Sequence, residues 1–208
     1  MISSSTSPAV RDNILSEQIL QAALQLYLQH GLKKVTLNDI ADRIGKTRSV
    51  LYYYYKDKKE IFEAVMEMLL RETTNEIGQE IAQAATLKNK LRAFCFAKIK
   101  TSEARKSVFT ALEADMDSEE MSQHTQTMLD IHKRMMQAES DLLNAIISES
   151  VKNGEIRRLK PQEHKMLISL LLCGIRGIKR ETGRNSDFNK PSATIDLLVE
   201  MTMKWLSE

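Results

Sequence analysis

Residues 36–62 read TLNDIADRIGKTRSVLYYYYKDKKEIF and contain several closely spaced helix signals. Thr36 is followed three residues later by Asp39, a spacing typical of a capping box at the start of a helix. Gly45 supplies a stop a little over two turns further on. The segment between these signals therefore predicts a short amphipathic helix. Its apolar stripe consists of Leu37, Ile40, Ala41 and Ile44.

Further helix signals lie on both sides of this short helix. Thr47 is the next N-cap after a two-residue connection, and predicts a third helix over about 48–54. Asp57 caps a fourth helix, with Glu60 at the capping-box position. Upstream, apolar residues at helical spacing predict a first helix over about 13–30. Three helices within 45 residues, two of them joined by a tight turn containing glycine, indicate a helix-turn-helix unit.

The composition of the whole chain favours an all-α protein. It has 208 residues, with only seven glycines and three prolines, too few for the turns of a β or α/β fold. No run approaches the ~18 apolar residues of a membrane span, and the opening MISSSTSPAV lacks the basic and apolar regions of a secretory signal. Cys95 and Cys173 lie far apart in apolar runs, which excludes a disulfide framework. We therefore expect a cytoplasmic protein without a membrane partner.

Charge is distributed unevenly along the chain. The net charge is only +2, but eight basic residues and three acidic ones lie between Lys33 and Lys59. All five tyrosines also fall within residues 1–60. A basic, tyrosine-rich helix-turn-helix is typical of a DNA-binding surface.

In a helix-turn-helix the second helix enters the major groove with its N-terminal residues at base edges. Here that helix begins with Arg48, which suits bidentate contact with guanine, and Ser49, which can pair with several bases. Thr36 and Lys58, at helix N-termini, can hold phosphates. For the other lysines nearby, a solvated face is the favoured interpretation.

The four consecutive tyrosines cannot all face DNA, because helical residues point about 100° apart. We expect Tyr55 and part of Tyr54 to lie in the core. Tyr52 and Tyr53 then face outward, where their hydroxyls can contact the DNA backbone.

Residues Ile19 to Phe62 resemble the DNA-binding domain of TetR-family transcriptional regulators. The resemblance rests on A-A-L-x-L-Y, G-L-x-x-V-T-L-x-D-I-A, I-G-K-T-R-S-V-L-Y-Y-Y-Y and K-D-K-x-E-I-F, without a gap. It implies DNA contacts, mostly to phosphates, at Thr36, Thr47, Arg48, Ser49, Tyr52, Tyr53, Tyr54 and Lys58. Lys46 departs from the family pattern, which usually has an apolar residue there; it either loosens local packing or adds a phosphate contact.

The sequence divides into three parts. Residues 1–10 are Ser-rich and predict a disordered arm, 11–58 the DNA-binding domain, and 59–208 a helical ligand-binding and dimerisation domain, as the resemblance implies. Long helices are expected near 60–84, 88–101, 103–115, 119–152, 161–182 and 192–206.

The last two of these helices are expected to form the dimer. Apolar residues spread around most of 161–182, and a helix that is apolar on several sides must be covered on several sides. The resemblance implies a four-helix bundle across a two-fold axis. The predicted interface residues are Leu167, Leu171, Gly174, Ile175, Ile178, Leu198 and Met203.

Candidate pocket residues are deformable apolar side chains of the second domain, because such side chains suit apolar ligands. For each of them, ordinary packing in the core is favoured over a role in a pocket. They suggest an apolar effector. His124 and His132 lie eight residues apart, too far for a helical metal pair, and no catalytic or cofactor motif is present. We expect no enzyme activity, metal or cofactor. The candidate residues for lining the effector pocket are Phe94, Phe96, Phe109, Met116, Met128, Met135 and Cys173.

These expectations describe a homodimeric regulator, more typically a repressor, that a small apolar effector releases from a pseudo-palindromic operator in double-stranded DNA. Two alternatives remain. The DNA-binding regulator could be controlled by a partner protein, or the chain could be an all-α carrier or enzyme.

Overall fold

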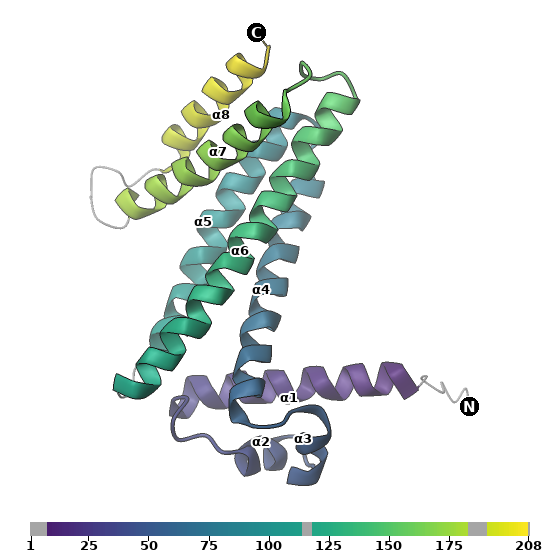
Figure 1. Ribbon diagram of the computed structural model, residues 1–208, viewed down its shortest axis with the longest axis vertical. Helices are drawn as coiled ribbons and strands as arrows, with labels where there is room; N and C mark the ends of the chain where they lie inside the picture. The colour runs from purple at the N-terminus through teal and green to yellow at the C-terminus, as the bar shows by residue number, and fades with distance from the viewer. Residues whose placement is uncertain (1–7, 114–117, 183–190, 208) are drawn as a thin grey trace. The chain divides into compact units, whose positions relative to one another are not determined.

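The computed structural model describes residues 8–113, 118–182 and 191–207, with side chains over 12–112, 125–181 and 191–207. These residues form eight helices and no strand, which confirms the all-α prediction (Figure 1). None of the described helices is long and apolar enough to cross a membrane. In chain order the helices are α1 (Pro8–His30), α2 (Leu37–Arg43), α3 (Arg48–Tyr54), α4 (Lys58–Ala82), α5 (Leu87–Glu113), α6 (Ser118–Lys152), α7 (Pro161–Thr182) and α8 (Pro191–Ser207).

The described residues form two compact units. The first contains those of 1–71 and 106–131, and the second those of 72–105 and 132–208. Helices α4, α5 and α6 each contribute one part to each unit. The functional boundary between residues 58 and 59 stays a prediction.

The first unit is built around one face of α1. Tyr27 of α1 is fully buried and meets the ring of Phe62 of α4 edge-on, with 6.3 Å between the ring centroids. Leu51 anchors α3 in the same core, so that one side of this short helix is buried and the other stays open. Figure 1 shows the short helices α2 and α3 beside the longer α1.

The helix boundaries follow the local signals in the sequence. The Thr36 backbone N–H donates to Asp39 Oδ2 at 2.7 Å, and Asp39 N–H donates back to Thr36 Oγ1 at 3.3 Å, which confirms the capping box. The backbone N–H and the hydroxyl of Thr36 both donate to the Asp39 carboxylate and hold its pKa below its usual value. Glu60 N–H donates to Asp57 Oδ1 at 2.9 Å at the start of α4. Gly45 has a φ of 64°, a left-handed conformation that favours glycine at a helix end.

Two helix predictions were wrong. Helix α1 begins at Pro8, so residues 8–10 of the expected arm are helical, while residues 1–7 lie outside the described part. Helix α5 is continuous, whereas a break near residue 102 was expected. Its Thr101 hydroxyl donates to the carbonyl of Ala97 at 2.9 Å, so this polar side chain is satisfied within the helix and does not interrupt it.

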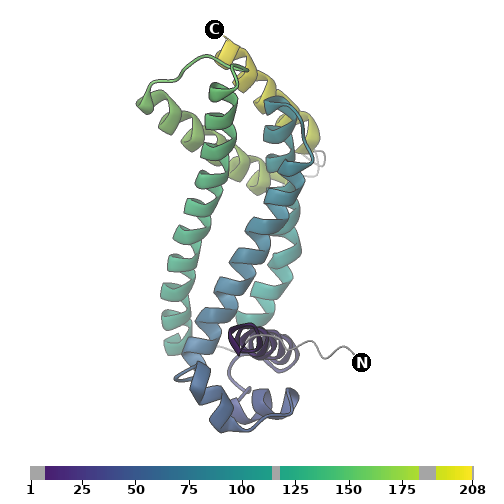
Figure 2. The ribbon, with the colours of Figure 1, turned by 90° about the vertical axis from the view of Figure 1, so that its right-hand side faces the viewer.

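The second unit has its own apolar core. Phe94 of α5, Leu143 and Ile147 of α6 and Ile195 of α8 are fully buried in it. Helices α7 and α8 lie next to each other in both views (Figures 1 and 2). This core is separate from that of the first unit.

The buried hydroxyl of Tyr27 has no hydrogen-bond partner among the described residues. Burial also raises the pKa of this phenol above its usual value. We expect Tyr27→Phe to stabilise the protein by about 1 kcal/mol, because it removes an unsatisfied polar atom and keeps the ring contact with Phe62. The midpoint of urea unfolding measures this change. Tyr55→Phe is the control: it deletes a hydroxyl that does have a partner, Ser16 Oγ at 2.8 Å, and should not stabilise. An unchanged or lower midpoint for Tyr27→Phe would contradict the expectation.

Candidate functional site

The candidate DNA-binding surface is the open side of the helix-turn-helix. Seven of the nine residues predicted to contact DNA are exposed, and the other two, Tyr54 and Lys58, are half-buried. The turn between α2 and α3 and the helix that follows it thus expose hydroxyl, lysine and guanidinium groups. The exposed seven are Thr36, Lys46, Thr47, Arg48, Ser49, Tyr52 and Tyr53.

The start of α3 presents its polar atoms outward. Thr47 occupies the N-cap with extended backbone, and its side chain makes no capping bond. Arg48 Nη2 donates to the Tyr52 hydroxyl at 2.5 Å, one turn along the helix, and its Cζ lies 5.2 Å from the centre of the Tyr52 ring. Tyr52 therefore holds the Arg48 guanidinium at the exposed start of α3, and a base contact by Arg48 stays a prediction.

The four tyrosines are arranged as predicted. The exposed fractions of Tyr52 and Tyr53 are 47% and 75%, whereas Tyr54 and Tyr55 pack against the core of the first unit. The Tyr54 hydroxyl donates to Asp12 Oδ1 of α1 at 3.1 Å. Burial, followed by this contact with Asp12, raises the pKa of Tyr54. A DNA contact by Tyr54 stays a prediction, and the structure shows that its hydroxyl first has to leave Asp12.

Lys58 lies at the N-terminus of α4, where backbone N–H groups and a cation can hold a phosphate together. Its Nζ donates to the backbone carbonyl of Lys33 at 3.0 Å, which joins α4 to the loop before α2. Lys46 is exposed just after Gly45. Its exposure supports the phosphate-contact alternative over a role in packing.

The predicted pocket residues are not gathered at one place. Phe94 is fully buried in the core of the second unit, Met135 is half-buried and Cys173 is exposed. Phe109 and Met128 belong to the first unit, where they pack against its core. Met116 and His124 lie outside the described side chains. Phe96 alone of the seven lines the groove described next.

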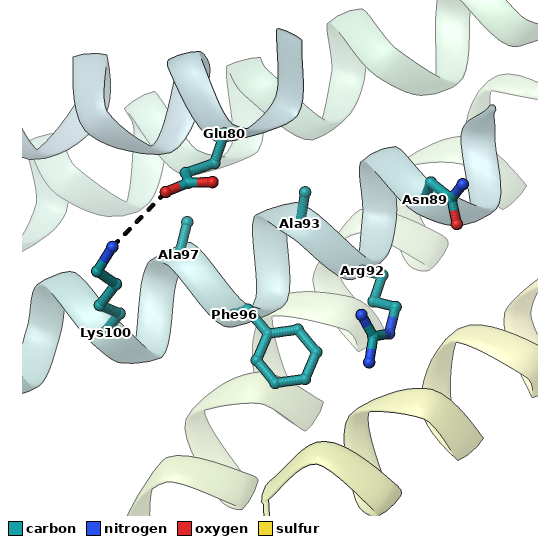
Figure 3. Close-up of a pocket in the computed structure, with 7 residues that line it drawn as sticks. All are labelled: Glu80, Asn89, Arg92, Ala93, Phe96, Ala97 and Lys100. Atoms are coloured by element: carbon teal, nitrogen blue, oxygen red, sulfur yellow. Dashed lines mark ion pairs between the residues drawn. The ribbon is translucent and has the colours of Figure 1, made fainter. Parts of the chain in front are cut away.

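A groove of about 390 Å³ runs along α4 and α5 in the second unit (Figure 3). Figure 3 shows Glu80 of α4 directed toward Lys100 of α5, while Arg92 and Phe96 lie one turn apart on α5. Its volume falls within the range of small-molecule sites. Among the described residues, no group of three His, Cys, Asp or Glu could hold a metal ion. The lining residues are Glu80, Asn89, Arg92, Ala93, Phe96, Ala97 and Lys100.

A buried ion pair in the second unit escaped the sequence analysis. Lys98 Nζ of α5 donates to Glu139 Oε1 of α6, and only 13% and 5% of the two side chains are exposed. No local pattern could have found this pair, because its partners are 41 residues apart.

The residues predicted for a dimer interface are mostly internal. Leu167, Leu171, Ile175 and Ile178 are buried in the chain's own core. A Cβ on Gly174 would lie 3.1 Å from Leu198 Cδ2, so this glycine permits close packing of α7 on α8 within one chain. The exposed large apolar residues of α7 and α8 lie on other positions, which we call the apolar stripe: Met166, Leu170, Leu197, Met201 and Trp205.

Helical spacing could have found the apolar stripe. Its residues recur in steps of four, from Met166 to Leu170 in α7, and from Leu197 through Met201 to Trp205 in α8. The sequence analysis selected the neighbouring face instead, because both faces of α7 are apolar. The interface expectation therefore moves to the large apolar residues that remain exposed, of which Trp205 is partly covered by the Arg157 guanidinium.

Comparisons with known proteins agree with this geometry. Residues 19–65 match the family described as bacterial regulatory proteins, tetR family. A probable acrEF/envCD operon repressor of Escherichia coli K12 is 35% identical over 65 residues, which cover 31% of this chain and 28% of that protein. The matching part thus spans less than a third of that relative's length.

Two longer alignments extend beyond the helix-turn-helix. The fatty acid metabolism regulator protein of Bacillus subtilis is 23% identical over 143 residues, which cover 67% of this chain and 70% of that protein. The solved structure of the transcriptional regulator FadR from Bacillus subtilis in complex with stearoyl-CoA matches with a TM-score of 0.55 and 17% identity, over 88% of this chain and 97% of that one. The structural match shows a shared fold. The helix-turn-helix at residues 19–65 thus matches the tetR family of bacterial regulatory proteins, and the chain shares the fold of the solved FadR structure.

Proposed function

We propose that this protein is a ligand-responsive transcriptional repressor that binds a specific site in double-stranded DNA. The observation that carries the proposal is the exposed group on α3 and the turn before it, where Arg48, Ser49, Tyr52 and Tyr53 project from a helix anchored by Leu51. An N-terminal arginine on such a helix reads base edges, and the surrounding hydroxyls and lysines hold phosphates. Such a regulator acts in the cytoplasm and needs no catalytic activity.

The proposed protein acts as a homodimer. The apolar stripe on α7 and α8 supports this, because a run of exposed large apolar side chains marks an interaction surface. Gly177 of α7 has no atom within 4 Å of its would-be Cβ, which leaves room for a close approach by a second copy. Two copies related by a two-fold axis would place two α3 helices in successive major grooves, about 34–36 Å apart.

The second unit is the proposed site of regulation. The names of the Bacillus subtilis matches support a lipid-related effector, because they describe a fatty acid metabolism regulator and a FadR structure in complex with stearoyl-CoA. An effector that binds better to a dimer with the wrong spacing between its α3 helices would lower DNA affinity. The reverse also holds, because operator DNA would lower effector affinity by the same factor.

Selection of binding sites from a random duplex pool tests the proposal. We expect enrichment of a pseudo-palindrome with half-sites about one helical turn apart, and an affinity that falls steeply with salt. Equal, weak binding to every sequence would contradict it.

Arg48→Ala should weaken binding to the selected site by about 1–3 kcal/mol and relax the preference at one base position. The reason is that Arg48 supplies the guanidinium at the start of α3, where base edges come within reach. Binding isotherms with the selected site and with a scrambled duplex measure the two effects. Lys58→Ala is the comparison, since loss of a phosphate contact should weaken both duplexes alike and reduce the salt slope by about one. Equal losses on both duplexes for Arg48→Ala would show that Arg48 contacts only the backbone.

A further inference from the structure

The groove along α4 and α5 combines an apolar floor with a basic rim (Figure 3). The floor is formed by Ala93, Phe96 and Ala97 of α5. The ionised residues of the lining are Glu80, Arg92 and Lys100, which sum to a single positive charge. A ligand with an apolar body and one negative charge would complement this lining in both shape and charge.

Arg92 is the group placed to receive such a charge. Its Cζ lies 4.7 Å from the centre of the Phe96 ring, so the guanidinium rests at the edge of the apolar floor. Its contact with Asp196 of α8 is uneven, with 2.5 Å from Nε to Oδ1 and 3.5 Å from Nη2 to Oδ2. About half of each side chain is exposed, and exposed ion pairs contribute little to stability. A carboxylate or phosphate from solution can therefore replace Asp196 at small cost.

The other end of the groove is less suited to an anion. Lys100 is paired there with Glu80 at 3.6 Å. An adjoining hollow of about 110 Å³ adds Glu76, Gln79 and Gln83 to that end, and Glu76 is paired with Arg105 at 2.8 Å. The negative head of a ligand is thus favoured beside Arg92, with the apolar body lying over Phe96 toward Ala97.

We propose that this groove binds an amphipathic anion, with its apolar body on Phe96 and its carboxylate or phosphate on Arg92 in place of Asp196. The inference rests on the proposed function and deepens it by naming the chemical class of the effector and its site. Two ion pairs join α5 to α8, Arg92–Asp196 and Lys88–Glu200. A ligand on Arg92 would replace the first of these contacts with α8, the helix that carries three residues of the apolar stripe. Ligand binding and the dimer geometry are coupled through this contact.

Calorimetric titration of the full-length protein tests the chemical class. The probes are decanoate, decanol and decyltrimethylammonium, which share a ten-carbon chain and carry a negative, a neutral and a positive head. We expect decanoate to bind at least tenfold more tightly than decanol, and the ammonium to bind most weakly. Equal affinities for decanoate and decanol would overturn the proposal.

Variants at the two ion pairs test whether the ligand binds at Arg92. Arg92→Gln should lower decanoate affinity at least tenfold and leave decanol affinity unchanged. Asp196→Asn should raise decanoate affinity severalfold, because it removes the internal competitor for Arg92. The matched control is Lys88→Gln, which breaks the 3.1 Å pair between the same two helices outside the groove lining and should leave decanoate affinity unchanged. If Lys88→Gln lowers the affinity as much as Arg92→Gln, binding follows general surface charge and the proposal fails.

The same samples separate this inference from the proposed function. If decanoate binds through Arg92 but the protein selects no DNA site, the ligand-binding proposal for the groove is supported and the proposed repressor function is contradicted. If the protein selects a DNA site but no probe binds in an Arg92-dependent way, the repressor function stands and the groove proposal is overturned.

Discussion

Lys98→Met should destabilise the protein by about 3–5 kcal/mol, because it leaves the carboxylate of Glu139 buried without its cation. The Glu139 side chain is only 5% exposed, so water cannot replace the lost partner without opening the contact between α5 and α6. Methionine matches the length of the lysine stem, so little packing is lost with the charge. The missing charge therefore accounts for most of the expected effect.

A double variant separates charge from packing. Lys98→Met combined with Glu139→Met should recover most of the lost stability, since replacing both members of a buried pair by apolar residues is often neutral or better. Urea unfolding midpoints at one fixed protein concentration measure the cycle, because a dimer's stability depends on concentration. A single variant as stable as the wild type would show that the pair is open to water in solution, and a double variant no better than the single would show that lost packing causes the destabilisation.

The helix-turn-helix could be predicted because its determinants are local. The Thr36–Asp39 capping box involves residues three apart, and its bonds form within one turn. The outward directions of Tyr52 and Tyr53 follow from helical geometry once Leu51 is placed in the core. At this site sequence spacing fixes the three-dimensional arrangement with little help from distant residues.

The second unit could be predicted only as a set of helices. Its contacts join residues far apart in the chain, such as Arg92 with Asp196, which are 104 residues apart. The sequence also leaves open which face of α7 is buried, because Met166–Leu170 and Leu167–Leu171 are both apolar pairs at helical spacing. The packing of α7 in the core of the second unit decides that the second pair is buried. The periodicity of a single helix cannot tell which of its two apolar faces is buried.

Met201→Glu should convert the proposed dimer to a monomer. Met201 is the middle residue of the stripe on α8 and is 62% exposed, so in a two-fold interface it would be covered only by the second copy. A central interface residue typically contributes at least ~2 kcal/mol, and the substitution occurs twice per dimer. The dimer dissociation constant should therefore rise about a thousandfold, and affinity for a palindromic site should fall with it.

Sedimentation equilibrium measures the change, and Leu129→Glu is the matched control. Leu129 of α6 is 50% exposed, so the control introduces the same charge at an exposed apolar residue of another helix. A dimeric Leu129→Glu and a monomeric Met201→Glu, both with wild-type helicity, would locate the interface on the stripe. A dimeric Met201→Glu would instead move the interface off α8. In that case the Arg92–Asp196 contact would have no route to the spacing of the α3 helices, and effector control would have to act within one subunit.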